Sequence, residues 1–187
     1  MSYFFEGWLL AAYIIIALII TAKAAYKNEH PITRSVCFVG FFIYLYFLID
    51  LTQFPIYVSP SMAEELGGNI FNSLNLIPFK DIFNMSGFYN IVATIPLGVL
   101  IPLITQRIWS FESISLMGIC TGLLLEGLQL CQLFIIGYTL RIVDDNDVIC
   151  NGLGVIIGYI VFKAGYTLLS SLANKTLSNF ITDYFRS

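Results

Sequence analysis

Charged residues are scarce in this sequence. Only 11% of its 187 residues are Asp, Glu, Lys or Arg, whereas soluble domains carry roughly 25%. Hydrophobic residues make up 58% of the chain, which argues against a water-soluble globule. The formal net charge of −3 lacks the basic footprint that nucleic-acid binding requires, so we expect no nucleic-acid partner.

Residues that commonly carry enzyme chemistry are also few. The single histidine, His30, lies in a polar connector, which leaves no Ser-His-Asp or Cys-His arrangement near the other polar candidates. No glycine-rich phosphate loop, zinc pattern or dinucleotide fingerprint is present, so we predict no cofactor and no bound metal. The four cysteines lie in or beside apolar runs without paired ligand spacing, and we interpret them as small buried apolar residues: Cys37, Cys120, Cys131 and Cys150.

Long hydrophobic runs are what the sequence has in abundance. A membrane-spanning helix needs about 20 mostly apolar residues. We therefore predict an all-α integral membrane protein, a bundle of about five transmembrane helices that forms one domain over residues 1–187. The five runs are Trp8–Ala25, Val36–Val58, Phe88–Ile104, Ile114–Ile136 and Asp147–Leu172.

The runs and their connectors differ in character. The first run is too long for a signal-peptide core and has no basic leader, so we expect a retained helix. The third is the shortest and contains two prolines and a glycine, which predicts the most broken span. The connector 59–87 is long enough for a small surface helix or a re-entrant segment, with a break at Gly67-Gly68. Residues 173–187 form a short mixed tail.

The distribution of lysines and arginines predicts the orientation. Cytoplasmic loops are enriched in these residues. With the N-terminus outside and the C-terminus inside, the inner side receives Lys23, Lys27, Arg34, Arg107, Lys175 and Arg186. The outer side then receives only Lys80 and Arg141. We therefore expect the connectors 59–87 and 137–146 to face outward.

Glu126 and Gln129 are the polar residues of the fourth run. They are three positions apart and so share a helix face. Glu126 lies about 15 Å below the outer end of the run, where an ionised carboxylate is costly unless it is paired. We expect Glu126 to be protonated or paired with Arg141 or another donor. The alternative is that the acid and the amide only hold neighbouring helices together through hydrogen bonds.

A polar stripe opens the fifth run. Asp144, Asp147, Asn151, Gly154 and Gly158 follow one another at offsets 0, 3, 7, 10 and 14, which places them on one helix face. The glycines favour close approach of another helix, and we expect the upper part of the stripe to confront Glu126 and Gln129 of the fourth run. Aspartates in a first turn also cap a helix. The three aspartates beside Arg141 could instead hold a divalent cation, although their spacing matches no known ligand loop.

Several separated motifs together resemble the VanZ-like membrane protein family, over a region of about residues 36–165. No single motif is decisive, but their order and spacing are. They are Asn75-Leu-Ile-Pro78-Phe79, Asn90 followed by Ile95-Pro96-Leu97-Gly98, Glu126-x-x-Gln129, and Arg141-x-x-Asp144-x-x-Asp147-x-x-x-Asn151-x-x-Gly154-x-x-x-Gly158. The run Asp145-Asn146 departs from the family's commonly less polar pair.

The resemblance implies a multi-pass protein of the bacterial plasma membrane, associated with tolerance of glycopeptide antibiotics such as teicoplanin. It further implies an outward-facing polar pocket that binds or modifies membrane lipids or lipid-linked envelope precursors. Glu126, Asp144 and Asp147 would be its acid or base candidates. The binding candidates would be Asn75, Asn90, Gln129, Arg141 and Asn151, with the Arg141 guanidinium holding a phosphate. A non-catalytic scaffold and a small transporter are the alternatives.

Overall fold

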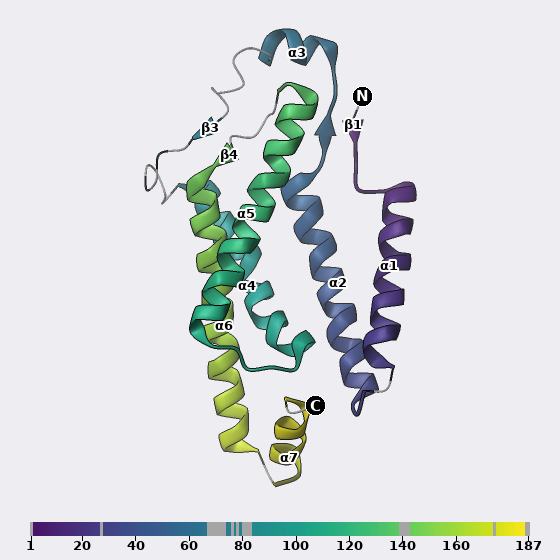
Figure 1. Cartoon of the computed structure of the whole chain (residues 1–187), viewed down its shortest axis with the longest axis vertical. Helices are drawn as coiled ribbons and strands as arrows, with labels where there is room; N and C mark the ends of the chain where they lie inside the picture. Colours follow the sequence, from purple (N-terminus) through teal and green to yellow (C-terminus); the bar gives the residue numbers. More distant parts are fainter. Residues whose placement is uncertain are drawn as a thin grey trace.

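The computed structural model describes residues 2–26, 28–66, 74–75, 77, 79, 84–138, 143–173 and 175–185. Five of its helices are long and apolar enough to cross a membrane, as the sequence predicts. They run alternately down and up, so that the N-terminus lies at one end of the bundle and the C-terminal helix at the other (Figure 1). We call these the N-terminal end and the opposite end.

The described elements follow the expected runs closely. The five long helices are α1 (Gly7–Ala25), α2 (Pro31–Gln53), α4 (Met85–Thr105), α5 (Phe111–Ile136) and α6 (Asp145–Leu172). Two short helices accompany them, α3 (Pro60–Leu66) at the N-terminal end and α7 (Lys175–Tyr184) at the opposite end. Two-residue strands form two pairs: β1 (Ser2–Tyr3) lies antiparallel to β2 (Ile56–Tyr57), and β3 (Leu74–Asn75) lies parallel to β4 (Val143–Asp144).

The core of the bundle is the packing of α6 against α4 and α5. On the α4 side, an added Cβ at Gly154 would overlap Thr94, and one at Gly158 would overlap the carbonyl oxygen of Ile95. On the α5 side, Gly118 and Gly152 face each other, so both backbones approach closely without intervening side chains. Small residues permit this approach in membranes, where dispersion contacts rather than the hydrophobic effect hold helices together.

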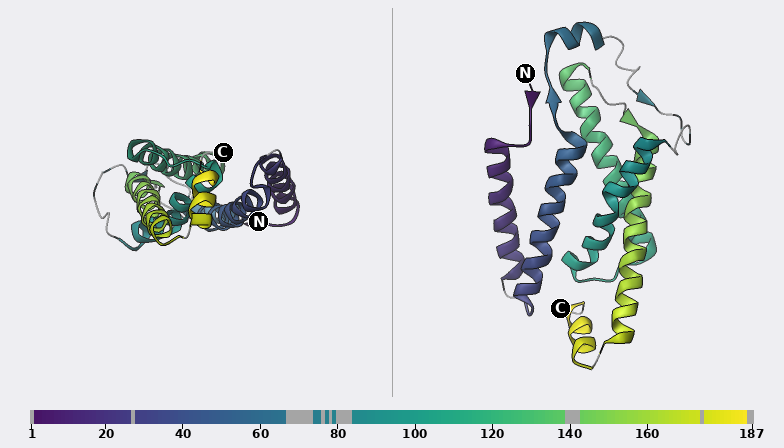
Figure 2. Two further views of the ribbon diagram at one scale, coloured as in Figure 1. Left: turned by 90° about the horizontal axis from the view of Figure 1, so that it is seen from below. Right: turned by 180° about the vertical axis from the view of Figure 1, so that it is seen from behind.

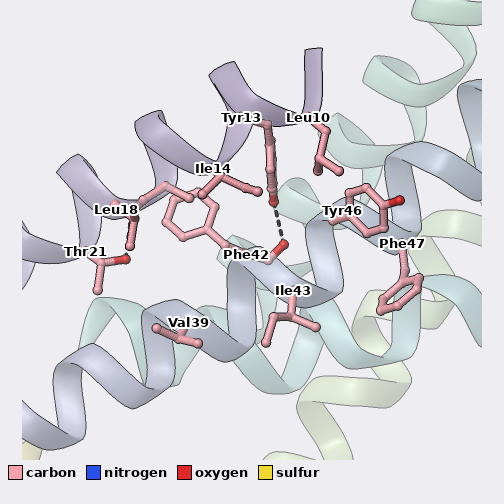
Figure 3. A pocket seen from close by; sticks show the side chains of 11 residues that line it. Leu10, Tyr13, Ile14, Leu18, Thr21, Val39, Phe42, Ile43, Tyr46 and Phe47 are labelled. Atoms are coloured by element: carbon pink, nitrogen blue, oxygen red, sulfur yellow. Dashed lines mark hydrogen bonds between the residues drawn. The ribbon is translucent and has the colours of Figure 1, made fainter. Parts of the chain in front are cut away.

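α1 lies at the edge of the bundle and packs chiefly against α2 (Figure 2). It has no buried residue, which suits a helix surrounded by hydrocarbon. An open apolar groove of about 460 Å³ runs between the two helices (Figure 3). The hydroxyl of Tyr13 donates to the carbonyl oxygen of Phe42 across it, and the hydroxyl of Thr21 donates to Ala17 of its own helix. The hydroxyls of Tyr13 and Thr21 are thus engaged within the protein.

Two expectations for the spans are corrected. α2 ends at Gln53 and not at Val58, because Pro55 disfavours helical geometry at the preceding residue. α4 is a continuous helix of 21 residues and is longer than α1, although it contains Pro96 and Pro102. Proline is tolerated inside membrane helices where neighbouring helices support the backbone, and α6 gives α4 that support.

The C-terminal tail is more ordered than a short mixed segment. α7 carries apolar residues at offsets 0, 3, 4 and 7: Leu177, Phe180, Ile181 and Tyr184. The hydroxyl of Tyr184 donates to the carbonyl oxygen of Leu103, and its own carbonyl accepts from Nε2 of Gln106 at 3.1 Å. Burial raises the pKa of the Tyr184 phenol, so the phenol remains a neutral donor. These bonds tie α7 to the last turn of α4 and to the α4–α5 connector.

Glycine packing yields a test of the core. We expect Gly158→Ala to lower the free energy of unfolding by about 1–3 kcal/mol or more, because its methyl group would overlap backbone atoms of α4. Gly165→Ala is the matched control on the same helix, since a Cβ there has no atom within 4 Å. Unfolding of both variants in detergent, followed by circular dichroism, measures the difference. Equal stability of the two variants would show that the close approach is unimportant.

Candidate functional site

A polar cavity lies between α2, α4, α5 and α6 in the half of the bundle nearer the N-terminal end. Its volume is about 720 Å³. Among the described residues it is lined by Leu51, Thr52, Asn84, Ser86, Tyr89, Asn90, Val92, Ala93, Gln129, Asp144 and Asp147. Four of the residues chosen from the sequence, namely Asn90, Gln129, Asp144 and Asp147, therefore meet at one cavity.

Asp144 is the N-cap of α6 and the junction of three segments. Its Oδ1 accepts hydrogen bonds from the backbone N of Asn146 at 2.8 Å and from Nδ2 of the same residue at 2.9 Å. Its Oδ2 accepts from Nδ2 of Asn75 at 2.8 Å, which attaches β3 to the start of α6. Three donors thus hold this side chain at the N-terminal end of α6, the usual place for a capping aspartate. Both the capping role and the contact with Asn75 fix the position of this side chain.

Glu126 lies behind Asp144 and is only 6% exposed. Its Oε2 accepts from the backbone N of Asp144 at 3.2 Å, so the structure supplies a donor other than Arg141. Glu126 precedes the end of α5 by ten residues, about 15 Å, yet it contacts the residue just before α6. The start of α6 therefore lies well below the end of α5 (Figure 1).

Asp147 follows one turn after the cap and faces α4. Its Oδ2 accepts from the hydroxyl of Ser86 at the long distance of 3.4 Å, and the amide of Asn90 also interacts with its carboxylate. Within the described part of the chain, no lysine or arginine lies among the residues that line the cavity. Asp147 is 9% exposed, and this remaining surface opens onto the cavity. It is the carboxylate best placed to meet a ligand.

The lower part of the polar stripe faces α4, and this includes Asn151. This corrects the expectation that all the polar residues in the upper part of the stripe confront Glu126 and Gln129. The hydroxyl of Thr94 on α4 donates to the backbone oxygen of Asn151 at 2.9 Å, and Gly154 and Gly158 pack against α4 as well. Asn151 is buried and is not among the residues that line the cavity. Asp144, the cap residue at the top of the stripe, donates its backbone N–H to Glu126. The physical reason is that a strict helical stripe faces a single neighbour, and the glycines select the closest one.

Some of the important polar residues were not selected from the sequence. Asn146 is 3% exposed; its Oδ1 accepts from the backbone N of Phe79 at 2.6 Å, and its Nδ2 donates to the carbonyl oxygen of Ile77 at 3.2 Å. Asn146 thus anchors the long connector between α3 and α4. The only sequence signal for this role is that the pair Asp145-Asn146 is more polar than is common in the family. Ser86 and Thr94 carry no sequence signal beyond their position. Arg141 and Pro78 lie outside the described residues.

The arrangement does not provide a metal site in the described part of the chain. No three His, Cys, Asp or Glu side chains are grouped there as ligands. The amide and hydroxyl groups of the cavity can donate to or accept from an uncharged or charged head group. Asp147 can in addition exchange a proton, which is the requirement for a general acid or base.

The contact between Asn75 and Asp144 can be tested by a double-mutant cycle. We expect Asn75→Ala and Asp144→Ala to show a coupling energy of about 1–3 kcal/mol, as for hydrogen bonds to charged groups. Asp145 is the matched control, because it is adjacent to Asp144 and makes no described hydrogen bond to Asn75. Unfolding free energies of the four variants of each cycle give the coupling. A value near zero for the Asp144 cycle would show that β3 is not attached to α6 in this way.

Comparison with known proteins identifies the family of the chain. No curated protein and no solved structure matches the chain significantly. A model of one protein family, described as VanZ/LLP1, matches residues 41–169, which is more than half of the chain. The match begins within α2 and includes the helices and connectors that build the cavity; it leaves out α1. The chain therefore belongs to the VanZ/LLP1 family.

Proposed function

We propose that the polar cavity binds, and in its reactive form modifies, the head group of a membrane lipid or lipid-linked envelope precursor. The observation that carries this proposal is a cavity of about 720 Å³ with carboxylate, amide and hydroxyl walls inside a bundle of membrane-spanning helices. Polar groups inside a membrane are costly and mark functional sites by default. Because the family is associated with teicoplanin tolerance, we propose that the protein acts on the cell envelope at the bacterial plasma membrane.

The residues divide into those that form the walls and those that meet the ligand. Glu126 and Asp144 are engaged by backbone and side-chain donors and hold the start of α6 in place. Asp147, Asn90 and Gln129 line the cavity and are the groups that contact a head group. If a reaction takes place, Asp147 is the general acid or base. Arg141 remains our candidate for a phosphate contact, since it precedes by three residues Asp144, which lines the cavity.

We also propose that the cavity faces outward and that the C-terminus lies inside. Lys23, Arg34 and Arg107 lie at the opposite end of the bundle, away from the cavity. The acidic side chains of Glu64 and Glu65 are exposed on α3 at the N-terminal end. A cytoplasmic position for the basic end follows from the positive-inside rule.

A non-catalytic scaffold is the second candidate. The observation that favours it is the thorough internal bonding of Asp144 and Asn146, which resembles a structural network. Such a network predicts that substitutions reduce the amount of folded protein and leave no separate functional defect. The following test distinguishes the two.

We expect Asp147→Asn and Asn90→Ala to abolish teicoplanin tolerance while the protein remains in the membrane. These changes remove groups that line the cavity but no helix cap. Asp145→Asn is the matched control, because Asp145 is a neighbouring first-turn carboxylate that is not among the lining residues. The measurement is the inhibitory concentration in a susceptible host, with immunoblots of membrane fractions. The proposal is wrong if the wild-type chain confers no tolerance or if both cavity variants retain it at equal protein levels.

The proposed orientation predicts the pattern of chemical labelling in intact cells. A membrane-impermeant maleimide should label Glu64→Cys on α3 and should leave Glu29→Cys, in the α1–α2 connector, unlabelled until the cells are opened. Both positions are exposed. The wild-type chain is the blank, because its four cysteines lie within membrane-spanning helices. The reverse labelling pattern would invert the topology.

A further inference from the structure

We propose that the ligand reaches the polar cavity sideways from the bilayer, through an opening between α2 and α4, and that its hydrocarbon chain lies in this opening. The ligand class is therefore an amphiphile that carries an acyl or polyprenyl chain, and a free water-soluble head group is excluded. This inference rests on the proposed function and specifies its substrate class and its route of entry.

The first observation is the composition of the cavity wall on this side. Leu51 of α2 and Tyr89 and Val92 of α4 line the cavity, yet they are 65%, 58% and 48% exposed. The remaining walls carry Asp147, Gln129 and other polar groups. The cavity thus changes from polar to apolar toward an open edge. Such an edge fits an amphiphile with its head group inward and its chain outward.

The second observation is that the other helix–helix seams carry close backbone contacts or bridging hydrogen bonds between side chains and backbone. Gly154 and Gly158 bring α6 against α4, and Gly122 faces Val148, whose carbonyl oxygen would be only 2.5 Å from an added Cβ. Between α2 and α5, Nε2 of Gln132 donates to the backbone oxygen of Gln53 at 3.3 Å and to its Oε1 at 3.2 Å. Of the four seams around the cavity, the one between α2 and α4 is the one whose lining side chains are exposed and apolar.

The third observation is a hydrogen bond that limits the opening on its lower side. The hydroxyl of Tyr44 on α2 donates to the carbonyl oxygen of Ala93 on α4 at 2.9 Å, and Ala93 itself lines the cavity. Tyr44 precedes Leu51 by seven residues, about 10 Å along the helix. The opening therefore lies above this bond, between the final turns of α2 and the first turns of α4. Both segments belong to membrane-spanning helices, so the opening faces hydrocarbon.

The test uses the full chain, purified in nanodiscs that contain a total bacterial lipid extract, with retained lipids identified by native mass spectrometry. We expect a lipid that the wild-type protein retains to be lost at least tenfold in Leu51→Trp and Val92→Trp, because the indole fills the opening. Leu123→Trp is the matched control: Leu123 lies on α5 one turn before Glu126, is 57% exposed and does not line the cavity. The deacylated head group of the same lipid should not compete for the site.

The outcomes separate this inference from the proposed function. Loss of the lipid in Asp147→Asn with full retention in both Leu51→Trp and Val92→Trp overturns the side entrance and leaves the proposed function intact. Competition by the deacylated head group likewise overturns the requirement for a chain. Retention of every lipid in Asp147→Asn and Asn90→Ala overturns the proposed function, and the side entrance with it. Size-exclusion profiles check that each variant is folded. If one variant of a pair does not fold, the other variant of that pair carries the test.

Discussion

The close approach of α4 and α6 is the constraint on which the rest of the molecule depends. It is possible because Gly98, Gly154 and Gly158 place backbone against backbone where any Cβ would collide. In a bilayer, dispersion contacts and hydrogen bonds must supply the association that the hydrophobic effect supplies in water. This seam holds Asp147 beside Ser86 and Asn90, about two turns above the glycines. The same contact therefore both assembles the bundle and orients one wall of the cavity.

The start of α6 is the second organising point. Asp144 joins three elements: it caps α6, accepts a hydrogen bond from Asn75 of β3 and donates its backbone N–H to Glu126 of α5. The costly buried carboxylate of Glu126 is thereby matched to a backbone donor, as membrane interiors require. The arrangement places the helix start about 15 Å below the end of α5. The polar residues at the start of α6, Asp144 and Asp147, therefore line a cavity at that depth.

The cavity and the groove between α1 and α2 differ in the polarity of their lining. The lining of the groove is almost entirely apolar, and the hydroxyls of Tyr13 and Thr21 are engaged within the protein. The cavity joins polar walls to the exposed apolar side chains of Leu51 and Val92. This gradient from polar to apolar matches the structure of an amphiphile. The family match starts within α2, so the cavity belongs to the part of the chain that the family shares, whereas α1 does not.

By itself, the sequence determined the elements: hydrophobic length predicted the five long helices, and helical periodicity placed Asp144, Asp147 and the glycines on one face. The length of a helix and the face on which a residue lies depend on neighbours along the chain, so the pattern of the sequence is enough to predict them. Only the tertiary structure decided that this face packs on α4, that Glu126 is paired with a backbone N–H, and that Asn146 anchors a distant connector. Continuity of α4 through its prolines and the ordered α7 were likewise decided by packing. The physical reason is that a polar residue in a membrane needs a partner, and the identity of that partner depends on how the helices cross.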